Sequence, residues 1–179
     1  MILQADLTQT TQRSLAEQFF LQTQGRWSSQ RRYYTLPNGK IQEISSILEI
    51  QYLPQGHEAL HHLAQLHHLD DPTALWYGTQ VSWDSEESVN RRKQSQGTTV
   101  FGIAGTTLYR DRGFATSKPV TAKFYLSNPQ TLCLRTEYNN SVFEEEIKLI
   151  GNNYRTRQTI ISRAGEEQTI GQYLEKRIA

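Results

Sequence analysis

The chain has 179 residues, about the size of one domain, and 36% of them are hydrophobic. Its 19 Lys and Arg residues against 18 Asp and Glu residues argue against broad electrostatic binding of nucleic acid, which needs an excess of cations. The single cysteine, Cys133, excludes an internal disulfide framework and a multi-cysteine metal site. The start lacks a signal-peptide pattern, and no apolar run reaches the roughly 18 residues of a membrane helix. We therefore expect one cytoplasmic domain over residues 1–179, with no membrane span.

The first predicted element is an N-terminal helix over residues 6–24. Leu15 and Phe19 are four residues apart, as are Ala16 and Phe20, so the helix has one apolar face. We expect this face to pack against the rest of the domain and to carry no chemistry of its own.

A β-hairpin follows, in which the hydrophobic period changes to two. Residues 27–36 and 40–53 are predicted strands, and Asn38-Gly39 between them favours a tight turn because both residues tolerate positive φ. A short additional helix is predicted over residues 56–69.

Short strands make up the rest of the chain. They are predicted at residues 75–84, 98–105, 107–111, 120–126, 131–138, 142–150 and 154–162. The polar residues 85–97 are predicted to form a mobile loop. Many short strands joined by tight turns predict a mainly β protein, an antiparallel barrel or sandwich. A flanking N-terminal helix followed by about eight strands fits a small closed barrel with a ligand-binding mouth.

All five histidines lie between His57 and His68, which raises the question of a metal site. His57 and His61 are four residues apart and share a helix face, but the pattern provides no third ligand. A solvated helix surface is the favoured interpretation, and a zinc or haem protein is the minor alternative. Cys133, between two leucines of a strand, is interpreted as a small core residue rather than a nucleophile.

The segment from residue 142 to 162 contains the most informative charges. Glu145 alternates onto the same face as its apolar neighbours, and a lone carboxylate there costs several kcal/mol unless it is paired. Arg155 and Arg157 share a face of the next predicted strand and can supply the partner. An internal salt bridge is the favoured interpretation. The functional alternative is a ligand with both N–H donors and acidic groups.

Aromatic residues accompany arginines elsewhere in the chain. Trp76 and Trp83 flank one predicted strand, and Tyr33 and Tyr34 follow Arg31 on another. Such residues suit a flat conjugated ligand with carboxylates, although an ordinary barrel core with a cationic rim explains them equally well.

Five ordered segments resemble the CpcS/CpeS-type phycobiliprotein lyases, the enzymes that attach open-chain tetrapyrroles (bilins) to antenna proteins. The segments are GRWSSQR at 25–31, WYGT at 76–79 with Trp83-Asp84, YRDRGFA at 109–115 with Pro119-Val120, EEEI at 144–147, and NYRTR at 153–157. Each segment is weak by itself, and the five in this order are specific.

The resemblance implies a lipocalin-like antiparallel β-barrel that binds phycocyanobilin or phycoerythrobilin as a substrate, with no prosthetic group. The implied activity transfers the bilin to a cysteine of an apo-phycobiliprotein α or β subunit and forms a thioether. The implied location is the cytoplasm, or the plastid stroma of an alga. The resemblance leaves open whether the protein works alone, as a homodimer, or as a heterodimer with a sister lyase subunit.

The resemblance also implies roles for individual residues. It places the reactive groups at Glu145 and Arg155, implies bilin contacts for Arg31, Trp76, Trp83, Arg157 and Thr159, and implies no metal ligands. Tyr33-Tyr34 and Glu146 depart from the family pattern, which leaves the bilin and the subtype open. Two alternatives share every pocket residue: a bilin carrier without transfer, and a partner subunit of a heterodimeric lyase.

Overall fold

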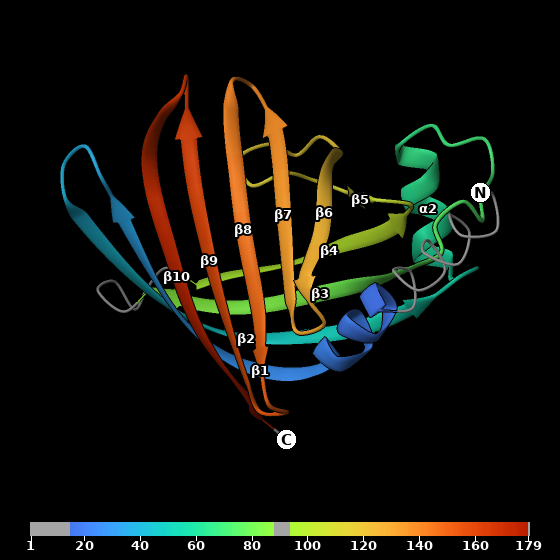
Figure 1. The fold of residues 1–179 in the computed structure, drawn as a ribbon, viewed down its shortest axis with the longest axis horizontal. Helices are drawn as coiled ribbons and strands as arrows, with labels where there is room; N and C mark the ends of the chain where they lie inside the picture. The colour runs from blue at the N-terminus through green and yellow to red at the C-terminus, as the bar shows by residue number, and fades with distance from the viewer. Residues whose placement is uncertain (1–14, 88–93, 179) are drawn as a thin grey trace.

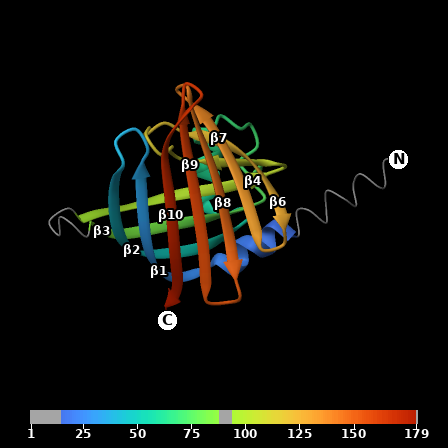
Figure 2. The ribbon, with the colours of Figure 1, turned by 60° about the vertical axis from the view of Figure 1, so that its left-hand side comes forward.

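The computed structural model describes residues 15–87 and 94–178, and its central feature is one closed antiparallel β-barrel (Figures 1 and 2). Each strand pairs with its neighbours in chain order, and β1 closes the barrel against β10. The predicted mainly β, lipocalin-like barrel with two helices is therefore confirmed, with ten strands where about eight were expected.

The strands differ widely in length. Their bounds are β1 Gly25–Thr35, β2 Lys40–Pro54, β3 Tyr77–Glu87, β4 Gln94–Ala104, β5 Thr107–Arg110, β6 Val120–Asn128, β7 Thr131–Tyr138, β8 Ser141–Ile150, β9 Tyr154–Arg163 and β10 Glu166–Ile178. Residues 15–23 are helical, and α2 spans Glu58–Leu66. Of the predicted N-terminal helix, residues 6–14 lie outside the described part of the chain.

Two predictions about the strands were wrong. Much of the predicted loop 85–97 belongs to β3 and β4, which pair as far as Glu86 with Gln94, while residues 88–93 lie outside the described part. Strand β10 was not predicted at all. In both places the inward positions carry Ser, Gly, Tyr or Glu in place of aliphatic residues. Backbone hydrogen bonds of neighbouring strands hold such segments without an apolar alternation.

The helix at residues 15–23 packs against the barrel and directs Phe19 and Phe20 into its core. Trp27, which has no exposed surface, donates its indole N–H to the carbonyl oxygen of Thr23 at 2.9 Å. Arg177 of β10 donates to the carbonyl oxygens of Gln22, in the last helical turn, and of Gln24, just after the helix. These contacts fix the helix against β1 and β10.

Helix α2 lies on the outside of the barrel, where Leu60 and Leu63 pack against β3 and β4 in a second apolar cluster. Two glycines that face each other across these strands, Gly78 and Gly102, make the close approach possible. Within residues 15–87 and 94–178, no helix has the length and apolar character needed to span a membrane.

Replacing Gly78 with alanine is expected to destabilise the protein more than the same change at Gly102. A Cβ at Gly78 would lie 2.0 Å from the backbone oxygen of Phe101, whereas a Cβ at Gly102 would meet a leucine methyl carbon at 2.7 Å. Overpacking against backbone costs about 3 kcal/mol, and movable side chains lower the cost to about 1 kcal/mol. Urea unfolding of the two variants tests this order. Equal losses would contradict it.

Candidate functional site

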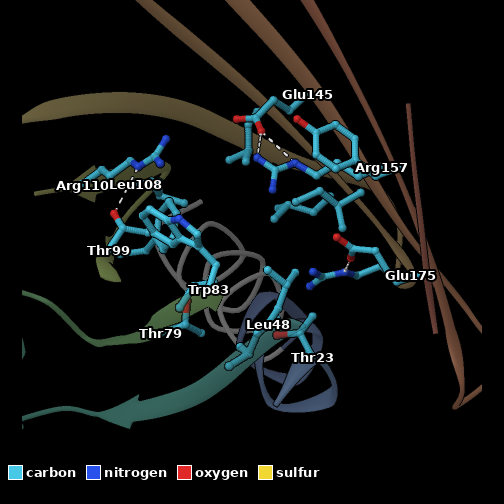
Figure 3. A pocket seen from close by; sticks show the side chains of 18 of the residues that line it. Thr23, Leu48, Thr79, Trp83, Thr99, Leu108, Arg110, Glu145, Arg157 and Glu175 are labelled. Carbon is cyan, nitrogen blue, oxygen red and sulfur yellow. Dashed lines mark hydrogen bonds and ion pairs between the residues drawn. The ribbon is translucent and has the colours of Figure 1, made fainter. Parts of the chain in front are cut away.

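The interior of the barrel contains a cavity of about 370 Å³ (Figure 3). Aromatic and aliphatic side chains from the helix and from both halves of the barrel line it, together with five arginines and two glutamates. The charged residues are Arg31, Arg110, Arg112, Arg155, Arg157, Glu145 and Glu175. The lining thus has a formal excess of three positive charges, which favours an anionic ligand.

Glu145 of β8 points into the cavity and forms an ion pair with Arg157 of β9 (Figure 3). The Arg157 Nε donates to Glu145 Oε1 at 3.0 Å, and Nη2 donates to the same oxygen. Burial by itself would lower the pKa of Arg157, but the charge and hydrogen bond of Glu145, together with Tyr173 and Glu175, outweigh burial and raise that pKa above its ordinary value. The predicted internal salt bridge of Glu145 is therefore confirmed. It is a diagonal pair, because Thr159 is the residue directly opposite Glu145.

A second ion pair lies on the same wall, between Arg155 of β9 and Glu175 of β10. The two residues are directly opposite in the register, and both side chains are almost completely buried. The Ser29 hydroxyl also donates to Glu175, at 3.1 Å. Sequence reasoning missed Glu175 because it missed β10. The alternation of Gly171, Tyr173 and Glu175 was the available signal.

Arg31 of β1 has no carboxylate partner among the described residues. Its Nη2 donates to the hydroxyls of Ser46 and Ser85, the latter at 2.9 Å, and its guanidinium lies 5.8 Å from the centre of the Tyr173 ring. Tyr173 exchanges a hydrogen bond of 2.8 Å with Tyr33, and burial raises its pKa well above the ordinary value. This phenol therefore stays protonated at neutral pH.

Of the remaining predicted site residues, one lines the cavity and two do not. Trp83 lines the cavity, whereas Trp76 precedes β3 and packs against the apolar core without lining it. Thr159 is 1% exposed and its hydroxyl has no hydrogen-bond partner among the described residues, yet it does not line the cavity. It lies opposite Gly171, where the rings of Tyr33 and Tyr173 fill the space.

Two cavity arginines, Arg110 and Arg112, were not predicted as site residues, although both stand in the YRDRGFA segment. Arg112 donates to the carbonyl oxygen of Thr98 and lies 4.9 Å from the ring centre of Trp83. The signal that could have found them is the density of arginine in a segment between strands of a predicted binding barrel.

The histidines serve helix α2 and its contacts. His57 accepts a hydrogen bond from the backbone N–H of Ala59 at the start of the helix. His67, after the last turn, makes a 2.9 Å hydrogen bond from Nε2 to the carbonyl oxygen of Arg110. In the part of the chain that the structure describes, no three His, Cys, Asp or Glu residues are grouped as metal ligands.

A closed antiparallel barrel around a charged, aromatic cavity defines the class of lipocalin-like β-barrel proteins. Within that class the chain belongs to the family of CpeS-like proteins, whose family model matches residues 16–178.

Relatives and one solved structure agree with this assignment. The chain is 57% identical to a putative phycocyanobilin lyase CpcS 2 of Nostoc sp. (strain PCC 7120), with 96% of each chain covered. It is 46% identical to a putative chromophore lyase CpcV of Picosynechococcus sp., covering 94% of this chain and 84% of that protein. The S-type phycobiliprotein lyase CPES of Guillardia theta has the same fold, with a TM-score of 0.77 at 20% identity over 92% of this chain and 93% of that one.

Proposed function

We propose that this protein is a bilin lyase, which binds an open-chain tetrapyrrole in the barrel cavity and transfers it to a cysteine of an apo-phycobiliprotein subunit. The observation that carries the proposal is the cavity lining, where arginines and glutamates stand among aromatic side chains. Aromatic faces suit a flat conjugated ligand, guanidinium groups bind its propionates, and carboxylates accept its pyrrole N–H groups. The names of the relatives support the same activity over nearly the whole chain.

In this proposal the wall formed by β8 to β10 binds the pyrrole rings. Glu145 accepts pyrrole N–H groups, and Arg157 holds its carboxylate in place. Arg155 adds positive charge to the same wall while Glu175 keeps it fixed. Thr159 lies directly opposite Glu145 in the register of β8 and β9. It supports that wall and makes no direct contact with the ligand.

Residues outside this wall bind the edges and the face of the ligand. Arg31 binds a propionate, because no carboxylate of the described residues neutralises it. Trp83 supplies the flat surface, and Trp76 supports the core next to it.

The transfer step is an addition. Protonation of the tetrapyrrole, with Glu145 as donor or as the counter-ion, makes its ethylidene side chain a better electrophile. The sulfur of the acceptor cysteine bonds to the side-chain carbon, and the thiol proton is taken up by the conjugated system, so no group leaves. The acceptor thiol belongs to the partner protein. Cys133 does not line the cavity, so we assign it no bond to the bilin.

Mixing the purified protein with phycocyanobilin, and then adding an apo-phycocyanin β subunit, tests the proposal. We expect a red-shifted complex, followed by a subunit that keeps its colour in acid. The variant Cys133→Ser, as a control, should transfer the bilin at the normal rate. Binding without transfer to any apo-subunit would identify a carrier and contradict a lyase. Activity that requires an added sister chain would identify a partner subunit instead.

A further inference from the structure

Arg110, the last residue of β5, places a positive charge in the cavity, and no carboxylate of the described residues forms an ion pair with it. Its Nε makes one long hydrogen bond, 3.4 Å, to the hydroxyl of Thr99. The adjacent carboxylate of Asp111 is occupied instead with the Thr99 hydroxyl, which donates to it at 2.6 Å. The two terminal nitrogens of Arg110 make no hydrogen bond to the described residues, so their donors can bind a ligand.

The guanidinium of Arg110 lies over two phenyl rings. It lies 5.0 Å from the ring centre of Phe101, its cross-strand neighbour, and 4.8 Å from that of Phe114. Phe114 itself stacks on Phe143 at 4.9 Å with the planes 10° apart. Contacts with ring faces restrict the position of a guanidinium, so its donor fork is oriented before a ligand arrives.

Hydrogen bonds also fix the backbone around Arg110. His67 holds its carbonyl oxygen from helix α2, at 2.9 Å. Gly113 leaves room for the Tyr138 hydroxyl, which accepts the backbone N–H of Ala115 at 2.8 Å and so shapes the turn that brings Phe114 back. These contacts of the YRDRGFA segment together hold Arg110 in one orientation.

The electrostatic environment agrees with this geometry. Burial lowers the pKa of Arg110 below its ordinary value, and the negative charges of Glu145 and Asp111 offset only part of this effect. Arg155 and Arg157 each have a glutamate partner, and Arg112 donates to a backbone carbonyl. Arg110 and Thr99 lie on one side of the cavity, and the Glu145–Arg157 pair lies on the other (Figure 3).

We infer that Arg110 binds one carboxylate of the ligand, as a second acid-binding residue separate from Arg31. This inference rests on the proposed function. A bilin has two propionates. Three cavity arginines, Arg31, Arg110 and Arg112, lack a carboxylate partner among the described residues, and of these Arg110 is the one whose two terminal nitrogens make no hydrogen bond to those residues. Arg110 thereby selects ligands with two acidic groups and sets the position of the tetrapyrrole along the cavity.

The test compares phycocyanobilin with its dimethyl ester, which keeps the ring system and removes both charges. Binding of each is measured by absorbance titration of the whole protein. Arg110→Gln should weaken binding of the free acid about 10- to 100-fold, the usual loss for a charge-assisted hydrogen bond. It should change binding of the ester less than about twofold. Arg110→Lys should recover part of the loss, because it restores the charge without the fork.

Arg135→Gln is the matched control, since Arg135 is exposed on the outer face of β7 and pairs there with Glu137 and Glu144. It should leave the preference for acid over ester unchanged. The thermal midpoint of ligand-free Arg110→Gln should fall only slightly, because the change removes ring contacts and one long hydrogen bond but no ion pair. A normal acid preference in Arg110→Gln, or a large fall in its midpoint, would overturn the inference. Failure of the unmodified protein to bind either compound would instead overturn the proposed function, and the inference with it.

Discussion

Glu145→Gln is expected to reduce bilin transfer about 100-fold or more, the usual contribution of a positioned acid–base group. The amide cannot donate a proton to the tetrapyrrole or balance its positive charge. The change also leaves Arg157 without its anion, and loss of one partner of a buried pair costs about 3 kcal/mol of unfolding free energy. Transfer to an apo-subunit and urea unfolding measure the two effects separately.

Three consecutive glutamates provide the control for this experiment. Glu144 and Glu146 are exposed on the outer face of β8, whereas Glu145 is buried in the cavity. Glu146→Gln should therefore transfer bilin normally and unfold within about 0.5 kcal/mol of the unmodified protein. The double variant Glu145→Gln/Arg157→Met should recover stability but not transfer. Normal transfer by Glu145→Gln would show that the carboxylate has no part in the reaction.

Glu175→Gln is expected to destabilise the fold by about 3–5 kcal/mol, since it leaves the charge of Arg155 buried and unpaired. Replacing both residues with apolar ones, Arg155→Met/Glu175→Leu, should recover most of this loss. Glu49→Gln, on the exposed face of β2, should change stability by less than about 0.5 kcal/mol. If the double variant is as unstable as the single one, the unpaired charge is not the cause.

The same ion pair predicts a pH dependence of stability. Burial alone would raise the pKa of Glu175, but the charge and hydrogen bond of Arg155 lower it below the ordinary value of 4.5. The unfolded chain therefore takes up this proton first as the pH falls. The stabilisation is complete above pH 4.5 and is lost as the pH falls through the lower folded-state pKa. Urea unfolding from pH 7 to pH 3 should show the difference in unfolding free energy between the unmodified protein and Glu175→Gln becoming smaller. A constant difference would contradict this.

The sequence by itself determined the barrel and the side of the strand that several charged side chains face. A period of two fixes which side of a strand each residue faces, so the inward position of Glu145 followed from its apolar neighbours. The same rule placed Arg155, Arg157 and Thr159 together on the inner face of β9. These conclusions needed only local alternation.

The tertiary structure decided which charges meet. The partner of Glu145 depends on the register of β8 against β9, and the partner of Arg155 lies on β10, a strand without apolar alternation. The orientation of Arg110 depends on one ring from β4 and on another from the turn that follows β5. Facing direction is a property of one strand, whereas pairing is a property of the closed barrel. For that reason the sequence predicted the inner wall of the cavity, and only the fold separated its paired arginines from those free to bind acids.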